Sequence, residues 1–170
     1  MISAKMTDAL NKQLNKELYS AYLYLAMSAY FEDKNLKGMA RWMRVQADEE
    51  HIHGMKFFDF IQKVGSRVKL EQIQQPGFEW SGPVEVFQEA FEHEQFITKS
   101  INELVDLAMQ ERDHATSTFL HWFVDEQVEE EAIASDIVQK FNLIGDSKGG
   151  LFMLDRELGS RIMGAAPNNV

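Results

Sequence analysis

The chain has 170 residues, a formal net charge of −10 at pH 7 and no cysteine. The missing cysteines exclude disulfide scaffolds, thiolate metal sites and cysteine nucleophiles, and the acidic balance argues against nucleic acid as a partner, because phosphate binding needs basic patches. An apolar share of 45% predicts a single folded domain over residues 1–170, and no apolar run approaches the roughly 20 residues that cross a bilayer, so no membrane partner is expected.

Long stretches of helix-forming residues, with apolar side chains at spacings of three and four, occupy most of the chain. The first starts with MISAKMTDALNKQL, which lacks the unbroken apolar core of a secretory signal, so a cytoplasmic location is expected. Pro83 suits the first turn of a helix, and Gly145 suits the position just past the end of another. The predicted helices lie near 4–32, 35–64, 83–111 and 113–143, with a short fifth helix near 149–160.

The lengths of the connections predict how these helices are arranged. A few residues join the first helix to the second and the third to the fourth, so each pair should form an antiparallel hairpin. The connection near 65–82 is long enough, at roughly 59 Å when extended, to run past a 30-residue helix of about 45 Å. The third helix is then parallel to the second. We predict an all-α fold, a four-helix bundle over about 4–143 with one long crossover and a short fifth helix.

Each of the four long helices carries a carboxylate near the middle of its inward-facing apolar stripe. The helix midpoints fall near residues 18, 50, 97 and 128. At about 1.5 Å per residue, the four carboxylates lie within roughly 5 Å of one plane across the bundle. They are Glu17, Glu50, Glu94 and Glu130. His53, three residues after Glu50, shares its inward face, whereas His51 should point away.

Four buried carboxylates in one layer repel each other and lose their hydration, so either some are protonated or a cation is present. Two divalent cations would balance the four negative charges. Oxygen ligands with one imidazole and no sulfur favour iron or manganese over structural zinc. A single glutamate in a helical stripe more often reaches water at a boundary. Four at one depth, one of them in Glu-x-x-His spacing, predict a metal site.

The same residues resemble the non-haem bacterial ferritins over essentially the whole chain. The matching features are Glu17 with Tyr24, Glu49-Glu50-x-x-His53, Glu94, and the segment EQVEE at 126–130. The resemblance implies a ferritin-like bundle that oxidises Fe(II) to Fe(III) with dioxygen or peroxide, a ferroxidase, and stores ferric mineral. It also implies a hollow homo-oligomeric shell of twenty-four subunits. Leu151, Leu154 and Leu158 share one face of the short fifth helix, which fits an interface in such a shell.

Two positions distinguish this chain from related di-iron proteins. Gln127-x-x-Glu130 stands where a symmetric di-iron protein has a second Glu-x-x-His. In this respect the chain resembles ferritins rather than bacterioferritins. His51 stands where a bacterioferritin places its haem-ligating Met, so no haem is expected. The resemblance implies that Gln127 lies beside the second iron and hydrogen-bonds a bound water or oxygen species. Tyr24 would hydrogen-bond the site or supply an electron.

The resemblance also implies the iron ligands. Glu17, Glu50 and His53 would hold the first iron of a di-iron site. Glu94 and Glu130 would hold the second, with Glu50 bridging the two.

A second acidic cluster lies beside these ligands. Glu49, Glu126 and Glu129, with Glu130 shared, look like the third iron site of bacterial ferritins. On the residues alone, the same three glutamates also fit a solvated acidic face.

Two other functions deserve comparison. A di-iron redox enzyme that stores no iron would need an open substrate pocket, whereas Phe, Met and Leu fill the stripes around these ligands, and a rubrerythrin-like peroxidase would need a four-cysteine module. A purely structural bundle leaves four coplanar buried carboxylates unexplained. Iron storage is therefore the function that the sequence favours.

Overall fold

The computed structural model describes residues 2–163, which form five α-helices and no strand. The all-α fold with a short fifth helix is confirmed, and every helix end lies within two residues of the expected one. The helices are α1 (Ala4–Asp33), α2 (Lys37–Lys63), α3 (Pro83–Glu111), α4 (His114–Ile144) and α5 (Lys148–Leu158). Among the described helices, none is both long and apolar enough to cross a bilayer.

Polar side chains define where three of the helices begin. Ser3, Asp113 and Ser147 each accept a hydrogen bond from the backbone N–H three residues further on, at 2.9, 3.1 and 3.1 Å. These side chains satisfy N–H groups that have no partner within the helix. Pro83 opens α3, where its missing N–H is not needed, and Gly145 ends α4 with a positive φ of 50°.

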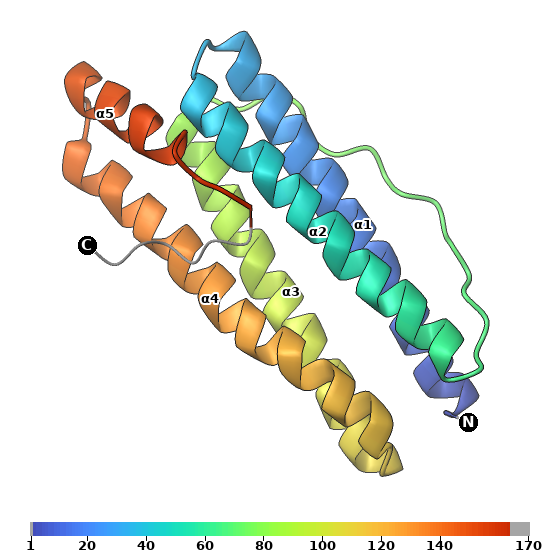
Figure 1. The fold of residues 1–170 in the computed structure, drawn as a ribbon. Coiled ribbons are helices and arrows are strands. Elements are labelled where there is room, and N and C mark those ends of the chain that lie inside the picture. The colour runs from blue at the N-terminus through green and yellow to red at the C-terminus, as the bar shows by residue number, and fades with distance from the viewer. Residues whose placement is uncertain (1, 164–170) are drawn as a thin grey trace.

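Two antiparallel hairpins make up the bundle, as predicted. α1 pairs with α2, and α3 pairs with α4, while the segment between α2 and α3 runs along the full length of the bundle and leaves those two helices parallel (Figure 1). Asn11 fastens the start of this crossover, because its amide donates to the Arg67 carbonyl at 3.1 Å and its oxygen accepts from the Lys69 N–H at 2.7 Å. The Tyr30 hydroxyl fastens the other end through the Trp80 carbonyl at 3.1 Å.

The core consists of two apolar clusters, one toward each end of the bundle. Phe31, Met43 and Phe87 belong to the cluster near α5, and Leu10 and Phe57 belong to the other. Neither cluster contains the glutamates that lie between them along the helices. Stable apolar packing on both sides therefore holds the polar middle of the bundle in place.

α5 packs against the start of α2 at an unusually close backbone approach. A Cβ atom on Gly38 would lie 1.6 Å from the carbonyl oxygen of Asp155, so only glycine fits at this point. The Asp155 carboxylate accepts from the Met39 N–H at 2.9 Å and caps α2 from α5. The segment after α5 then turns back toward the middle of the bundle (Figure 1).

Candidate metal centre

One glutamate from each long helix is buried at the middle of the bundle, and we call these four residues the carboxylate layer. No more than 4% of the surface of any of them is exposed. All four point inward, as the apolar stripes predict. The layer consists of Glu17, Glu50, Glu94 and Glu130.

Glu17, Glu50 and His53 form a converging group whose ligand atoms all lie within 4.8 Å of one another. On α2, the spacing of three residues brings His53 Nδ1 to 3.4 Å from Glu50 Oε2. Gly54 lies on the side of α2 that faces α1, and a Cβ atom there would come within 3.2 Å of Leu18. The glycine thus lets α1 approach closely enough to place Glu17 beside this pair.

A second converging group lies on the other side of the same histidine. His53, Glu126 and Glu130 place their ligand atoms within 4.8 Å of one another, and His53 Nε2 lies 3.8 Å from Glu126 Oε1. His53 therefore directs one ring nitrogen toward Glu50 and the other toward α4. The two groups share one imidazole and lie next to each other.

Glu94 belongs to neither of these groups and is held by two hydrogen-bond donors. The Tyr24 hydroxyl donates to Glu94 Oε1, and Gln127 Nε2 donates to Glu94 Oε2 at 3.2 Å. Burial, followed by the charge of Glu94, raises the pKa of Tyr24, so its hydroxyl remains protonated and donates. Tyr24 and Gln127 thus both contact the layer through the same carboxylate.

Two glutamines hold the remaining carboxylates, and sequence reasoning gave neither of them a role. Gln46 Nε2 bridges Glu50 Oε1 at 3.0 Å and Glu130 Oε2 at 2.9 Å. Gln13 Nε2 donates to Glu17 Oε1 at 2.7 Å. Each glutamine precedes a glutamate of the layer by four residues on the same helix face, and that repeated spacing is the signal that could have identified them.

The orientation of Gln13 is determined by a chain of hydrogen bonds that begins at a lysine. Lys16 Nζ donates to Ser100 Oγ at 2.5 Å, and Ser100 Oγ donates to Gln13 Oε1 at 2.5 Å. An ammonium group can only donate, and a hydroxyl has one proton to give. Gln13 must therefore present its carbonyl to Ser100 and its NH₂ to Glu17.

The electrostatics of the layer follow from its burial. Desolvation raises the pKa of Glu17, Glu50, Glu94 and Glu130 from 4.5 to about 8 in each case, and repulsion between the carboxylates adds to the rise. Within residues 2–163, no lysine or arginine forms an ion pair with Glu17, Glu50 or Glu94. Protons or cations must therefore neutralise the layer.

The predicted third site, which we call the outer acidic group (Glu49, Glu126 and Glu129), is only partly assembled. Glu126 joins His53 and Glu130, as described above, whereas Glu129 is exposed. Glu49 Oε2 accepts a hydrogen bond from Arg161 Nη2 at 2.5 Å. Arg161 had no sequence signal, because its position depends on how α5 docks.

Two histidines near the layer differ in environment. His93 lies between α1 and α3, with Nε2 2.7 Å from Ser20 Oγ and its ring edge-on to Tyr24. Burial lowers the pKa of His93 to about 4, so the ring is neutral at pH 7 and supports Tyr24 without adding charge. His51 is exposed on α2, as predicted.

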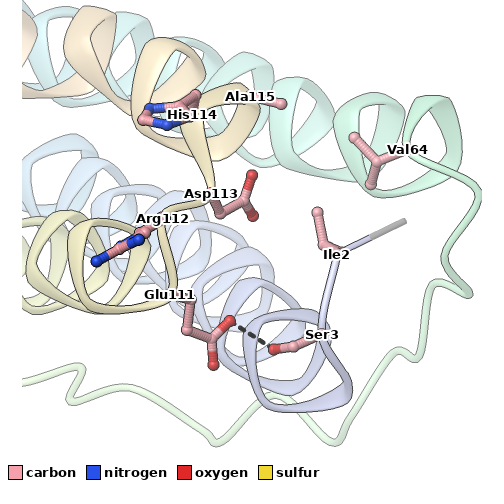
Figure 2. A pocket seen from close by; sticks show the side chains of 8 residues that line it. All are labelled: Ile2, Ser3, Val64, Glu111, Arg112, Asp113, His114 and Ala115. Carbon is pink, nitrogen blue, oxygen red and sulfur yellow. Dashed lines mark hydrogen bonds between the residues drawn. The ribbon is translucent and has the colours of Figure 1, made fainter.

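A separate pocket of about 680 Å³ opens at the end of the bundle that is opposite α5. Figure 2 shows its lining, in which the start of α1, the end of α2 and the α3–α4 turn meet. Ser3 Oγ donates to Glu111 Oε2 at 2.6 Å across this end. The pocket contains no member of the carboxylate layer, so it is not the centre of the predicted chemistry.

The chain is similar to known proteins both in sequence and in fold. A family model for the ferritin-like domain matches residues 7–144. The bacterial non-heme ferritin of Bacteroides fragilis (strain 638R) is 45% identical over 95% of this chain and 100% of its own length. That of Campylobacter jejuni is 40% identical over 92% of this chain and 93% of its own. The structure of an open pore ferritin from the hyperthermophilic archaeon Archaeoglobus fulgidus matches with a TM-score of 0.94 and 55% identity, covering 95% and 98% of the two chains.

Proposed function

The chain belongs to the ferritin family, and from that premise we propose that it stores iron in the cytoplasm after oxidising Fe(II) at the carboxylate layer. The observation that carries this proposal is the convergence of Glu17, Glu50 and His53 within 4.8 Å, in a buried layer that has four carboxylates. Buried carboxylates without a fixed counter-charge favour divalent cations, and carboxylate with imidazole suits iron.

The converging group of Glu17, Glu50 and His53 supplies the first Fe(II) position. Glu94 and Glu130 supply the second. Glu50 would bridge the two positions, since Gln46 Nε2 donates to both Glu50 and Glu130 and so holds these carboxylates side by side. Gln46 and Gln127 orient these carboxylates through hydrogen bonds, which leaves their other oxygen lone pairs available to bind cations. No residue is assigned to haem.

Oxidation is a two-electron step when both positions are filled. Each Fe(II) gives up one electron, and dioxygen takes both electrons and two protons to become hydrogen peroxide. When peroxide is the oxidant, it takes two electrons and two protons and yields two waters. Tyr24 is protonated and donates a hydrogen bond to Glu94, so it is placed to fix the position of that carboxylate or to supply a further electron.

The third iron position is formed by Glu49, Glu126 and Glu129 together with Glu130. Its support is the convergence of Glu126 and Glu130 on His53, beside the first position. Negative charge next to the oxidation site offsets the positive charge that builds up when Fe(II) becomes Fe(III).

A shell of twenty-four copies, built from this chain alone, would cover apolar side chains that a single chain exposes. Tyr22 and Leu25 on α1, with Ile73 and Phe78 on the crossover, lie exposed around one groove. An exposed apolar surface of this kind is typical of a subunit interface. The interior of such a shell is where ferric mineral would collect.

The test is iron retention after aerobic loading with Fe(II), with the native mass read from the same gel-filtration column. Storage predicts iron far in excess of the ligand positions, eluting with a large shell. Retention of only two or three irons per chain would instead identify a di-iron redox enzyme. An apoprotein control treated with Fe(III) citrate corrects for iron that adheres to the surface.

A further inference from the structure

A positively charged side chain from the end of the described chain lies at the edge of the carboxylate layer. Arg161 follows α5 by three residues, and only 13% of its side chain is exposed. Its Nη2 donates to Glu49 Oε2 at 2.5 Å, and its guanidinium carbon lies 4.4 Å from the centroid of the Trp42 ring. Arg161 thus combines an ion pair with a cation–π contact.

The face of α2 explains how Arg161 reaches this place. Gly38, Trp42 and Glu49 are separated by four and seven residues, so they follow one another along a single helix face. The close approach of Gly38 to Asp155 and Gly159 brings the end of α5 onto the beginning of that face. Arg161 then extends along it, over Trp42 and toward Glu49.

The charge of Arg161 acts on the metal centre as well as on its partner. Burial is the main cause that raises the pKa of Glu130, and the positive charge of Arg161 opposes that rise. Glu130 belongs both to the carboxylate layer and to the group that converges on His53. The guanidinium therefore lies within electrostatic range of the position proposed for the third iron.

Within residues 2–163, the hydrogen bonds of the Arg161 guanidinium are incomplete. Arg161 Nη1 is buried, and no residue in the described part of the chain accepts a hydrogen bond from it. A buried donor that lacks an acceptor weakens the state in which it is buried. Among residues 2–163, Glu49 and Trp42 are the contacts that hold the guanidinium of Arg161.

We propose that Arg161 is a tethered counter-cation that competes with the third iron for Glu49 and thereby sets the affinity of that position. The inference rests on the proposed function, because it concerns the third cation. Glu49 cannot offer the same oxygen to the guanidinium and to a metal, and the two positive charges repel each other. A cation that binds there must displace Arg161 from Glu49 and from the face of Trp42.

This competition has a consequence for the order in which the positions fill. The first two cations enter the carboxylate layer, where the described residues offer no fixed lysine or arginine to displace. The third must expel a guanidinium, so it binds last and more weakly. A multivalent cation can replace the single charge of Arg161 with a net gain in attraction, whereas a monovalent cation cannot.

Calorimetric titration of the assembled apoprotein with Zn²⁺ tests the proposal, because Zn²⁺ is divalent and redox-inert. The parent should show two tighter binding events and a weaker third per chain. Arg161→Gln removes the charge and should tighten the third event by about tenfold, whereas Arg161→Lys should remain near the parent. Glu49→Gln in either background should remove the third event and leave the first two.

The alternative is that Arg161 only pins the chain to α2. In that case Arg161→Gln leaves the third event unchanged or weaker, which would overturn the proposal. A titration with only two events in both the parent and Arg161→Gln would overturn the third position itself, and this inference with it. If the titration of the parent shows no tight binding of two Zn²⁺ per chain, that result would instead contradict the proposed function.

Fluorescence of Trp42 gives a second readout that does not depend on affinity. In a Trp80→Phe, Trp122→Phe background, Trp42 is the single tryptophan of the chain. Its emission should stay constant for the first two equivalents of Zn²⁺ and change with the third, when the guanidinium leaves the ring. Arg161→Gln should abolish that change. Constant emission throughout the titration of the parent would rule out displacement of Arg161.

Discussion

The carboxylate layer and the outer acidic group lie side by side but neutralise their negative charge in different ways. In the layer, glutamine and tyrosine side chains donate to the carboxylates, and burial raises the pKa of all four to about 8. In the outer group, Arg161 pairs with Glu49, and Glu129 is exposed. One region depends on protons or entering cations, and the other carries a cation of its own.

This difference shows how neighbouring acidic residues can have unequal affinities for the same ion. Hydrogen bonds from neutral groups fix a carboxylate without satisfying its charge, so the layer keeps its electrostatic attraction for divalent cations. An arginine satisfies both the charge and the geometry of its partner. If Arg161 competes for Glu49 as proposed, the outer position would lose an ion more readily than the layer, which would suit transfer of Fe(III) to a mineral.

Glu50→Ala should have the largest effect, because it removes a member of the carboxylate layer. Glu50 belongs to the first converging group and shares Gln46 with Glu130, so its loss disturbs both positions in the layer. We expect the initial rate of Fe(II) oxidation to fall by roughly 100-fold or more, with the shell still assembled. Stopped-flow absorbance of Fe(III) measures the rate. Glu92→Ala, an exposed glutamate on α3, serves as the control and should match the parent.

The stability of the apoprotein should depend on pH through the carboxylate layer. The pKa of each carboxyl group in the layer is about 8 in the folded protein and near 4.5 when exposed, so the folded state binds more protons between these values. The free energy of unfolding of the apoprotein should therefore fall as pH rises from about 5 to 8, by a few kcal/mol.

Thermal unfolding midpoints in the presence of a chelator, measured from pH 5 to 9, check this expectation. Glu94→Gln removes one titrating group and should flatten the curve. Added divalent cation should restore the midpoint at high pH. A midpoint that stays level or rises over this range in the parent apoprotein would show that the layer is not neutralised by protons.

The helical periodicity of the sequence predicted the layer but not what holds its members. Glu17, Glu50 and Glu94 fall on apolar stripes, and stripes are readable because helices place every third or fourth residue on one face. The link from Lys16 through Ser100 joins two helices and depends on side-chain rotamers, which no spacing within one helix reveals.

The outer group was harder to predict for a similar reason. Glu126 and Glu130 are one turn apart and share a face, whereas Glu129 lies to the side and is exposed. The position of Arg161 beside Glu49 depends on the contact between Gly38 and Asp155, which are distant in the sequence. A tertiary contact of that kind leaves no local pattern to read.

Gly38→Ala should disturb the surroundings of the outer acidic group and leave the carboxylate layer intact. A methyl group there would overlap the Asp155 carbonyl, so α5 should shift from α2 and carry Arg161 away from Glu49. We expect a thermal midpoint lower by several degrees, consistent with a loss of about 1–3 kcal/mol, and tight binding of two Zn²⁺ per chain as in the parent.

Gly149→Ala provides the matched control, because a Cβ atom at Gly149 would meet only Ser147 Oγ at 3.9 Å. The thermal midpoints of the two variants should therefore differ, whereas calorimetry should show two tightly bound Zn²⁺ per chain in both. If Gly38→Ala instead weakens the two tight events, the layer depends on α5 and the two regions are not separable.

The smallest effect is expected from Ser100→Ala, which interrupts the chain that orients Gln13. Without Ser100, neither orientation of the Gln13 amide is enforced, and Glu17 loses part of its fixed donor. The affinity for the first cation should fall by about threefold, which lies within the range expected for the loss of one hydrogen bond. Zn²⁺ calorimetry measures the change. Ser28→Ala removes a buried hydroxyl that donates to the Ala40 carbonyl, away from the layer, and should leave the affinity unchanged.

The most direct test of the carboxylate layer as the oxidation site is an anaerobic calorimetric titration with Fe(II), performed in two buffers of different ionisation enthalpy. In the parent we predict two Fe(II) bound tightly per chain at pH 7, with release of protons from the carboxyl groups whose pKa is raised. In Glu50→Gln, the tight binding and the proton release should both be lost. The same stoichiometry and affinity in that variant would show that Fe(II) binds elsewhere.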